Sequence, residues 1–443
     1  MKGLSVVGLG KLGACFAACF AYKGIPTLGL DINVDFVDAI NSGKSPVVEP
    51  GLQDLIDSCE SRLKATQDYE QVLTESEITF LVVPTPSSQS GHFSDKYLQD
   101  SLKHLSEALK KAGKEYHLFV ITSTVSPGSS EDNLIPLIES VSGKKLNRDF
   151  GVCYSPEFIA LGSVISDFLN PDLILIGESD QRAGDRLEAV YKACCENAPY
   201  MARMSLISAE IMKISLNSYV TMKISFANTL ANICEAVPGA NIDDITKALG
   251  ADKRISPHYL QGALGYGGPC FPRDNNAFLA FAAKYGVDAM LAKSTDSVNE
   301  FQTNHLLHQV GEHISNSNNN VVSILGLAYK PNTPEIEESA AKKLIEELIK
   351  RDLEVIVYDP LAMDNTRNHF GEDILYASSV RNCLSNSSLC IITTPDKEFK
   401  SIDDSYIIQN PTIIIDCWRI LEPSRFSERV RYFGIGIPSG GKS

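Results

Sequence analysis

Residues 3–13 read GLSVVGLGKLG, a short apolar run that ends in glycines. An Ala- and Phe-rich stretch with helical character follows to about Lys23, and PTLGLD (26–31) has the pattern of a second strand. A strand, a glycine turn, a helix and another strand in this order are typical of the opening of a parallel, doubly wound sheet. We therefore expect the chain to begin with an α/β domain of this kind.

The glycines of this turn have the spacing G-x-G-x-x-G, at Gly8, Gly10 and Gly13. In a dinucleotide site the first glycine permits the tight turn, the second lets a pyrophosphate approach the backbone, and the third lets the helix pack on the sheet. Asp31 ends the second strand, where a carboxylate bonds ribose hydroxyls and repels a 2′-phosphate. The pattern predicts an NAD site; the alternative, a glycine turn that binds nothing, fits this strand–turn–helix context less well.

Apolar strands recur along the first half of the chain, and three of them run into loops rich in Pro, Ser or Thr. They read ITFLVVPTP (78–86), HLFVITSTV (117–125) and FGVCYSPEF (150–158), and LILIG (173–177) is a further strand. Ligands of open α/β sheets sit at the carboxyl ends of the strands. Three successive polar strand ends therefore predict a single cofactor cleft.

The pattern changes to one long helix over about 205–236, without Pro or Gly, and the rest to about Val298 is mostly helical except for a Gly- and Pro-rich loop at 262–274. After the polar linker SNSNNN (315–320), strands and helices alternate again to about residue 418. The predicted fold is α/β, with two Rossmann-like doubly wound domains joined by a mainly helical middle domain that contains one long helix. The expected domains are 1–200, which binds NAD, 201–300, which is helical and carries the dimer contact, and 301–443, a second Rossmann-like domain for the nucleotide part of the substrate, with a disordered tail from about residue 439.

The composition is that of an ordinary globular protein, with 44% hydrophobic residues and a formal net charge of -15. An acidic surface repels phosphate backbones, so nucleic acid is not an expected partner. The sequence has no run of about 18 apolar residues, so we expect no membrane span. Residues 1–10 lack a charged region followed by a cleavage site, so we expect no signal peptide. Its eleven cysteines lack metal-ligand spacing, so we expect no metal site and a reduced, cytoplasmic protein.

The segment GYGGPCFPRD (265–274) places one thiol, Cys270, in a loop whose glycines and prolines set an irregular backbone. A thiolate can attack an aldehyde carbon and then carry the acyl group as a thioester. The alternative is a buried structural cysteine, which this loop context disfavours.

On the long helix, Lys213 and Asn217 are four residues apart and share a face. They could direct an ammonium and an amide at one substrate oxygen, although a solvated helix face explains such a pair equally well.

With these motifs the chain resembles the UDP-glucose / UDP-N-acetylmannosamine dehydrogenase family over about residues 1–425. The matching segments, in the family's order, are GLGKLG (8–13), VEPGL (48–52), PTP (84–86), STVSPG (123–128), SPEF (155–158), the helix with Lys213 and Asn217, GYGGPCFPRD (265–274), GLAYKPNT (326–333) and DCWR (416–419). The resemblance implies a four-electron oxidation of the C6 alcohol of a UDP-sugar to a carboxylate, with two NAD per sugar. The intermediates would be an aldehyde, a thiohemiacetal and a thioester.

The resemblance also implies residue roles. Cys270 would be the nucleophile, and Lys213 and Asn217 would stabilise the developing oxyanion. Asp274 and Thr124 would hold the water that hydrolyses the thioester, with Glu157 as the general base or its relay. The implied cofactor-binding residues are Gly8, Gly10, Lys11, Leu12, Gly13, Asp31, Thr85, Pro86, Thr124 and Arg273. The implied substrate-binding residues are Glu157, Phe158, Ile159, Lys213, Asn217, Arg254, Tyr259, Tyr266, Gly267, Tyr329, Lys330 and Arg419.

Three positions depart from the family's pattern. Leu161 stands where a second carboxylate is expected after SPEF, and Glu337 stands where an arginine near the cofactor is common. Arg273 stands where a lysine is common. The first two bear on cofactor affinity and on the choice of sugar. None of the three removes the nucleophile, the lysine or the asparagine.

The best guess for the substrate is UDP-glucose, and a UDP-N-acetylhexosamine is the alternative. A homodimer is implied, because family members associate through the long helix and Arg254 matches an arginine that reaches a neighbouring subunit's site. Two other readings are a single-step hydroxyacid dehydrogenase and a binding protein without turnover. Cys270 and the second nucleotide-like domain argue against the first, and the retained site residues argue against the second.

Overall fold

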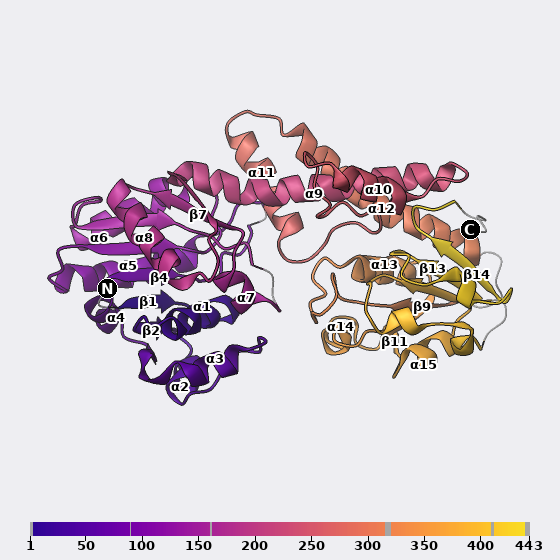
Figure 1. The fold of residues 1–443 in the computed structure, drawn as a ribbon, viewed down its shortest axis with the longest axis horizontal. Coiled ribbons are helices and arrows are strands. Elements are labelled where there is room, and N and C mark those ends of the chain that lie inside the picture. The colour runs from indigo at the N-terminus through magenta and orange to yellow at the C-terminus, as the bar shows by residue number, and fades with distance from the viewer. Residues whose placement is uncertain (1–2, 89, 160–161, 315–319, 409–411, 439–443) are drawn as a thin grey trace. The chain divides into compact units, whose positions relative to one another are not determined.

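The computed structural model describes residues 3–88, 90–159, 162–314, 320–408 and 412–438. The chain divides into two compact units, Met1–Ile214 (unit 1) and Ser215–Ser443 (unit 2), and each is described by itself (Figure 1). Both contain an open, mostly parallel sheet, so the predicted fold class is confirmed. Within the described ranges, no helix combines the length and the apolar character that crossing a membrane requires.

Unit 1 is built on an eight-stranded sheet in the order β3-β2-β1-β4-β5-β6-β7-β8, in which only the β6–β7 pair is antiparallel. The strands are β1 (Leu4–Val7), β2 (Thr27–Leu30), β3 (Leu63–Thr66), β4 (Ile78–Leu81), β5 (His117–Ile121), β6 (Phe150–Tyr154), β7 (Leu173–Glu178) and β8 (Tyr200–Ser205). The helices are α1 (Lys11–Tyr22), α2 (Val34–Asn41), α3 (Leu52–Ser58), α4 (Tyr69–Glu75), α5 (Lys96–Lys111), α6 (Ile135–Ser142), α7 (Val164–Leu169) and α8 (Gln181–Cys194). The order of the strands reverses between β1 and β4, where such sheets bind nucleotides at the carboxyl ends.

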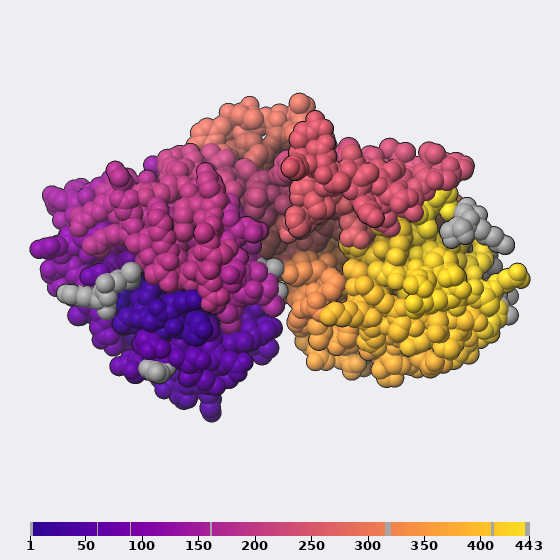
Figure 2. Space-filling model, in the orientation of Figure 1, coloured from indigo at the N-terminus to yellow at the C-terminus, as the bar shows by residue number. Residues whose placement is uncertain are grey.

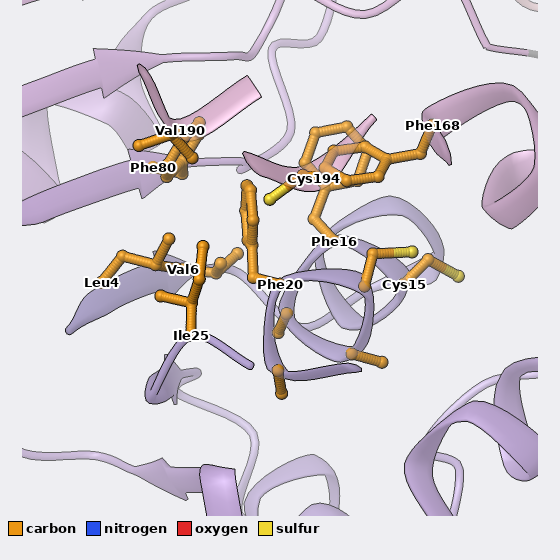
Figure 3. Packing of buried hydrophobic residues seen from close by; sticks show 14 of the residues in the cluster. Leu4, Val6, Cys15, Phe16, Phe20, Ile25, Phe80, Phe168, Val190 and Cys194 are labelled. Atoms are coloured by element: carbon orange, nitrogen blue, oxygen red, sulfur yellow. The ribbon is translucent and has the colours of Figure 1, made fainter. Parts of the chain in front are cut away.

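Two hydrophobic cores fill the two faces of this sheet. Helices α1, α2, α3, α7 and α8 contribute to one core, and α4, α5, α6 and the start of α9 contribute to the other. In the first core the ring of Phe20 lies against Phe80 and Phe168, at centroid distances of 4.8 and 5.2 Å, and Phe16 packs on Phe168 at 4.6 Å. Figure 3 shows these rings with Cys15 and Cys194 among them. This packing fixes α1, and therefore the glycine turn at its start.

Unit 1 ends within the long helix α9 (Leu206–Ala236), which continues into unit 2. Unit 2 then contains α10 (Ile242–Ala251), α11 (Phe271–Lys284) and α12 (Met290–Ile314). Its six-stranded parallel sheet has the order β11-β10-β9-β12-β13-β14. The remaining elements are β9 (Val321–Leu325), α13 (Ala340–Ile349), β10 (Glu354–Tyr358), α14 (Met363–Phe370), β11 (Leu375–Tyr376), α15 (Val380–Ser385), β12 (Leu389–Ile392), β13 (Thr412–Asp416) and β14 (Val430–Gly434).

Within unit 2 the helical segment and the sheet share one core. Ala231 and Cys234 of α9 and Ile242 of α10 are buried in the same cluster as residues of β9 and β13. The N–H of Ile242 donates to the carbonyl of Gly436, just after β14. Figure 2 shows these helices, pink to red, lying directly on the yellow C-terminal part of the chain.

Several strands that the structure contains have no strong signal in the sequence. β3 alternates buried and exposed residues, and β8 carries Arg203 in its middle. β14 contains the exposed Arg431 and forms the edge of its sheet. Residue Leu161, part of the linker (315–319) and the tail (439–443) lie outside the described residues, so the expectations placed on them stay predictions.

Candidate functional site

The glycine turn of unit 1 has the geometry that a dinucleotide pyrophosphate requires. Gly8 has a φ of +93°, and a Cβ there would overlap the carbonyl oxygen of Val82. A Cβ on Gly13 would overlap the carbonyl oxygen of Gly8, so α1 packs too closely on the turn for any larger residue. A Cβ on Gly10, by contrast, would meet no atom within 4 Å. The open side of the turn therefore faces outward at the start of α1, where backbone N–H groups and the helix dipole favour a phosphate.

Asp31 lies beside this turn at the end of β2. Its Oδ2 accepts a 2.6 Å hydrogen bond from the N–H of Leu9, and its Oδ1 accepts one of 2.8 Å from the N–H of Asn33. These bonds fix the carboxylate at the place where the ribose of a dinucleotide lies, and each oxygen keeps a lone pair for a hydroxyl. Lys11 and Leu12 open α1 next to Gly10. These residues fit NAD.

The loops after β4 and β5 are tied to each other. The hydroxyl of Thr85 donates to the carbonyl of Thr124 at 2.7 Å, and the hydroxyl of Ser123 accepts from the N–H of Val83 at 2.9 Å. Thr85 is buried, Thr124 is half-buried and Pro86 is exposed. The structure thus brings together the two loops in which cofactor-binding threonines are predicted.

A buried carboxylate that the sequence reading missed holds the second of these loops. Glu210 of α9 is 0% exposed and accepts from the N–H groups of Gly128 and Ser130, at 2.6 and 3.0 Å. Ser130 begins the helical segment that leads into α6, so Glu210 satisfies donors at a helix start. Burial raises the pKa of Glu210. Glu210 precedes Lys213 by one turn of α9, so the two side chains share a face of the helix. This spacing was the one indication in the sequence that Glu210 lies near the site.

Lys213 and the loop after β6 form a cluster in unit 1. The Lys213 ammonium is buried, donates to the carbonyl of Glu157 at 2.7 Å and lies 4.7 Å from the ring centroid of Phe158. The Glu157 carboxylate accepts from the N–H of Ile159 at 2.6 Å. The structure therefore brings together Lys213, Glu157, Phe158 and Ile159, all of which are predicted site residues.

Glu49, from the VEPGL motif, holds the far end of that loop. Its carboxylate accepts from the N–H groups of Gly162 and Val164, each at 3.0 Å, at the start of α7. VEPGL had no role in the sequence prediction beyond the resemblance. In the structure its glutamate, Glu49, caps the start of α7.

In unit 2 the thiol of Cys270 stands at the N-terminus of α11 and is exposed. Asp274 follows one turn later, with its N–H donating to the carbonyl of Cys270 at 2.8 Å. Its carboxylate is 1% exposed, accepts from the side-chain amide of Asn217 at 2.6 Å and lies 3.7 Å from Nε of Arg273. Three predicted catalytic residues of unit 2, namely Cys270, Asp274 and Asn217, are thus linked through one helical turn.

The glycines before Cys270 pack against the segment that follows β9. The N–H of Gly268 donates to the carbonyl of Glu337 at 3.0 Å. A Cβ on Gly268 would lie 2.6 Å from the ring of Tyr329, and one on Gly267 would overlap the carbonyl of Glu338. Burial, and then the charge of Cys270, raise the pKa of Tyr329 to about 12. Tyr329, which is predicted to bind substrate, therefore stays a neutral hydroxyl near the thiol.

The other predicted substrate residues of unit 2 have varied surroundings. Tyr259 packs edge-on against Phe271, at a centroid distance of 6.0 Å, and Lys330 lies 5.6 Å from the ring centroid of Tyr329. The hydroxyl of Tyr266 donates to Asp296. Arg254 is exposed and pairs with Asp252 at 2.6 Å. Arg419 forms a two-pronged ion pair with Asp243, at 2.7 and 2.8 Å, and also donates to the carbonyl of Ile435.

The mostly parallel sheet of unit 1, with its glycine turn and Asp31, is that of a dinucleotide-binding protein of Rossmann type. The sequence of the chain matches three domain descriptions of one family: the NAD binding domain of the UDP-glucose/GDP-mannose dehydrogenase family over residues 2–195, the central domain over 207–301, and the UDP binding domain over 323–423. The chain belongs to the UDP-glucose/GDP-mannose dehydrogenase family, and it is an NAD-dependent dehydrogenase of nucleotide sugars. The expected resemblance, cofactor and enzyme class are thereby confirmed.

Similar proteins of known name come from archaea and bacteria. The chain is 36% identical to UDP-glucose 6-dehydrogenase AglM of Haloferax volcanii, over 94% of this chain and 97% of that protein. It is 30% identical to GDP-mannose 6-dehydrogenase of Pseudomonas putida, over 90% and 92%. Among solved structures, a UDP-glucose dehydrogenase from Pyrobaculum islandicum matches with a TM-score of 0.89 and 30% identity, covering 99% of this chain and 98% of that chain.

Proposed function

We propose that this protein oxidises the C6 alcohol of UDP-glucose to the carboxylate of UDP-glucuronate, through a covalent adduct on Cys270. The observation that carries the chemistry is an exposed thiol at a helix start, with the buried carboxylate of Asp274 one turn further on. The choice of sugar is supported by the similarity to UDP-glucose 6-dehydrogenase AglM over nearly the whole of both chains.

The residues named above supply distinct parts of this chemistry. Bound NAD, held by the glycine turn and Asp31, would accept the hydride in each of the two oxidations. Lys213 and Asn217, four residues apart on α9, stabilise negative charge on the C6 oxygen as its proton leaves. The Cys270 sulfur then bonds to the aldehyde carbon to give a thiohemiacetal, whose oxidation leaves a thioester.

Hydrolysis of the thioester returns the free thiol. Water adds to the acyl carbon, the C–S bond breaks, and the products are the carboxylate and the Cys270 thiol. Asp274, fixed by Asn217, and Thr124 hold this water, and Glu157 accepts its proton directly or through a relay. Phe158, Ile159, Tyr259, Tyr266, Tyr329, Lys330, Arg254 and Arg419 are proposed to contact the UDP-sugar.

The test is NADH release from the purified protein against a panel of nucleotide sugars, with NADH counted per sugar. We expect UDP-glucose to give the highest kcat/KM and two NADH per sugar. A UDP-N-acetylhexosamine is the alternative substrate, and the 30% identity to GDP-mannose 6-dehydrogenase makes GDP-mannose a necessary member of the panel. One NADH per sugar would contradict the covalent mechanism, and a higher kcat/KM for another sugar would contradict the substrate.

The proposal extends to a cytoplasmic homodimer. Tyr219, Phe226 and Ile233 of α9 are each more than half exposed and recur every seven residues, so they form an apolar stripe suited to a second copy of the helix. None of the eleven cysteines, all of which are described, is in a disulfide. Light scattering should give twice the chain mass for the protein and a lower mass for Phe226→Glu.

A further inference from the structure

Side-chain amides bind several backbone groups of the irregular segment just before Cys270. The N–H of Ala263 donates to Oδ1 of Asn228 at 2.8 Å, and Nδ2 of Asn228 donates to the carbonyl of Leu264 at 3.1 Å. Nε2 of Gln302 donates to the carbonyl of Ala263 at 3.3 Å. Asn228 on α9 and Gln302 on α12 are 1% and 3% exposed, so these bonds are shielded from water.

Asn299 does the same for Tyr266, nearer to the thiol. Its Oδ1 accepts from the N–H of Tyr266 at 2.7 Å, and its Nδ2 donates to the carbonyl of the same residue at 3.1 Å. One amide thereby pairs with both backbone groups, as a neighbouring strand would. A Cβ on Gly265 would overlap Oδ1 of Asn299, which explains the glycine there. Asp296, one turn earlier on α12, accepts from the hydroxyl of Tyr266.

The loop needs this support because of its composition. Gly265, Gly267 and Gly268 precede Cys270, and each glycine has more backbone freedom to lose than any other residue. A thiol on a loosely held loop would be misplaced relative to an aldehyde carbon, and a displacement of about 1 Å can cost about 10²-fold in rate. The amides of α12 and α9 act against this freedom at the residues next to the glycines.

We propose that Asn299, assisted by Asn228 and Gln302, is a positioning residue that sets the reactive placement of the Cys270 thiol. The inference rests on the proposed function, because it takes Cys270 as the nucleophile. It makes a specific claim about which half of the reaction depends on Asn299. Oxidation of the alcohol to the aldehyde does not use the thiol, whereas oxidation of the aldehyde to the acid does.

The experiment measures the two halves separately in the full-length protein with NAD. One arm follows NADH from the UDP-sugar alcohol in a single turnover, and the other follows NADH from the corresponding UDP-sugar 6-aldehyde. In Asn299→Ala we expect the aldehyde rate to fall by about 10²-fold and the alcohol rate to change by less than about 3-fold. Asn304→Ala is the matched control, because Asn304 is exposed on the same helix; it should leave both rates unchanged.

A merely structural role predicts another pattern. If Asn299→Ala lowers both rates equally, or lowers neither, the proposal is overturned. Should that variant fail to fold, Asn299→Asp gives a second comparison. It keeps the acceptor for the N–H of Tyr266, loses the donor to the Tyr266 carbonyl and adds a negative charge, so it should also lower the aldehyde rate more than the alcohol rate. Cys270→Ala separates this inference from the proposed function. If Cys270→Ala retains aldehyde oxidation, the proposed function fails; if it loses that activity while the Asn299 variants keep it, only this inference fails.

Discussion

In unit 1 the loops at the strand ends are held by carboxylates, whereas in unit 2 the cysteine loop is held mainly by neutral amides. Glu49 and Glu210 each accept two backbone N–H groups at the start of a helical segment. Asn228 and Asn299 each bind one N–H and one carbonyl of an irregular segment. The cysteine loop thus depends on amides where these two helix starts depend on carboxylates, although carboxylates hold other loops of unit 2, as Asp359 does for Leu327 and Ala362.

The difference follows from which backbone groups lack a partner in regular secondary structure at each place. A helix start exposes only N–H donors, and a carboxylate with its two oxygens satisfies them in pairs. A loop without a strand partner leaves both donors and acceptors, and an amide can pair with one of each through its oxygen and its nitrogen. The amide also adds no negative charge beside Cys270, where a second anion would oppose a thiolate.

The largest effect that bears on this comparison is expected from Cys270→Ser, which keeps the loop and removes the sulfur. A serine is a weaker nucleophile, and its ester is a poorer acyl donor than a thioester. Steady-state NADH production from UDP-glucose should therefore fall by several orders of magnitude. Intact-mass measurement should show the sugar trapped on the variant. A near wild-type rate with two NADH per sugar would show that catalysis does not need the Cys270 sulfur, and the loop that holds it would then have no catalytic role.

Glu210→Ala tests the carboxylates of unit 1, because it removes the acceptor that holds the loop after β5. It leaves the N–H groups of Gly128 and Ser130 buried without an acceptor, which should cost about 3 kcal/mol of unfolding free energy. Urea unfolding measures this loss. Glu131→Ala is the control, because Glu131 is an exposed glutamate in the helical segment that begins at Ser130. A loss of less than about 1 kcal/mol for Glu210→Ala would show that the loop does not depend on this carboxylate.

A third test concerns Asp31, another carboxylate of unit 1, which is expected to bind the cofactor rather than to hold a loop. NADP should support turnover about 10²-fold less well than NAD in kcat/KM, since a 2′-phosphate would face a like charge. Asp31→Ser should narrow that ratio, although it also removes the bonds to Leu9 and Asn33. Equal kcat/KM for the two cofactors in the wild type would remove the discriminating role of Asp31.

The smallest effect concerns an ion pair between the amide-bearing helices α9 and α12 of unit 2. Nε2 of His305 on α12 lies 2.6 Å from Glu235 of α9, and this hydrogen bond raises the pKa of His305 above its usual value of about 6.5. A raised folded-state pKa means that the stabilisation is complete below about pH 6.5 and is lost as the pH rises through the folded-state value.

The thermal midpoint of the wild type should therefore fall, relative to that of His305→Gln, as the pH is raised from 6 to 9. The difference should correspond to about 1 kcal/mol or less, because the pair is partly exposed. Glu235 also accepts from Gln309 and from the N–H of Gly436, and these bonds are independent of pH in this range. Parallel midpoints for the two proteins would show that His305 is not charged in the fold.

Local sequence patterns were sufficient for much of this architecture. The turn at Gly8–Gly13, the end of β2 at Asp31 and the start of α11 at Cys270 each depend on residues adjacent in the chain. The spacing of Lys213 and Asn217 placed both residues on one helix, α9. The hydrogen bond between Asn217 and Asp274 was not predicted, because the two residues are 57 positions apart in the chain. The roles assigned to these residues remain predictions.

Other features could not be read because their partners are distant. Asn299 follows Tyr266 by 33 positions, and Glu210 follows Gly128 by 82, so each resembles an ordinary polar residue on a helix. β8 and β14 were missed because charged residues interrupt them at sheet edges, where one side of a strand faces water. The units divide inside α9, and a continuous helical pattern gives no sign of such a boundary.

The exposure of Cys270 has a practical consequence. Of the eleven cysteines it is the one that is exposed, and burial raises the pKa of others, such as Cys15 and Cys194, to about 12. Those thiols carry almost no thiolate at neutral pH, so an alkylating reagent has a single preferred target in each chain. The number of equivalents consumed would then count the chains in a preparation whose Cys270 is accessible.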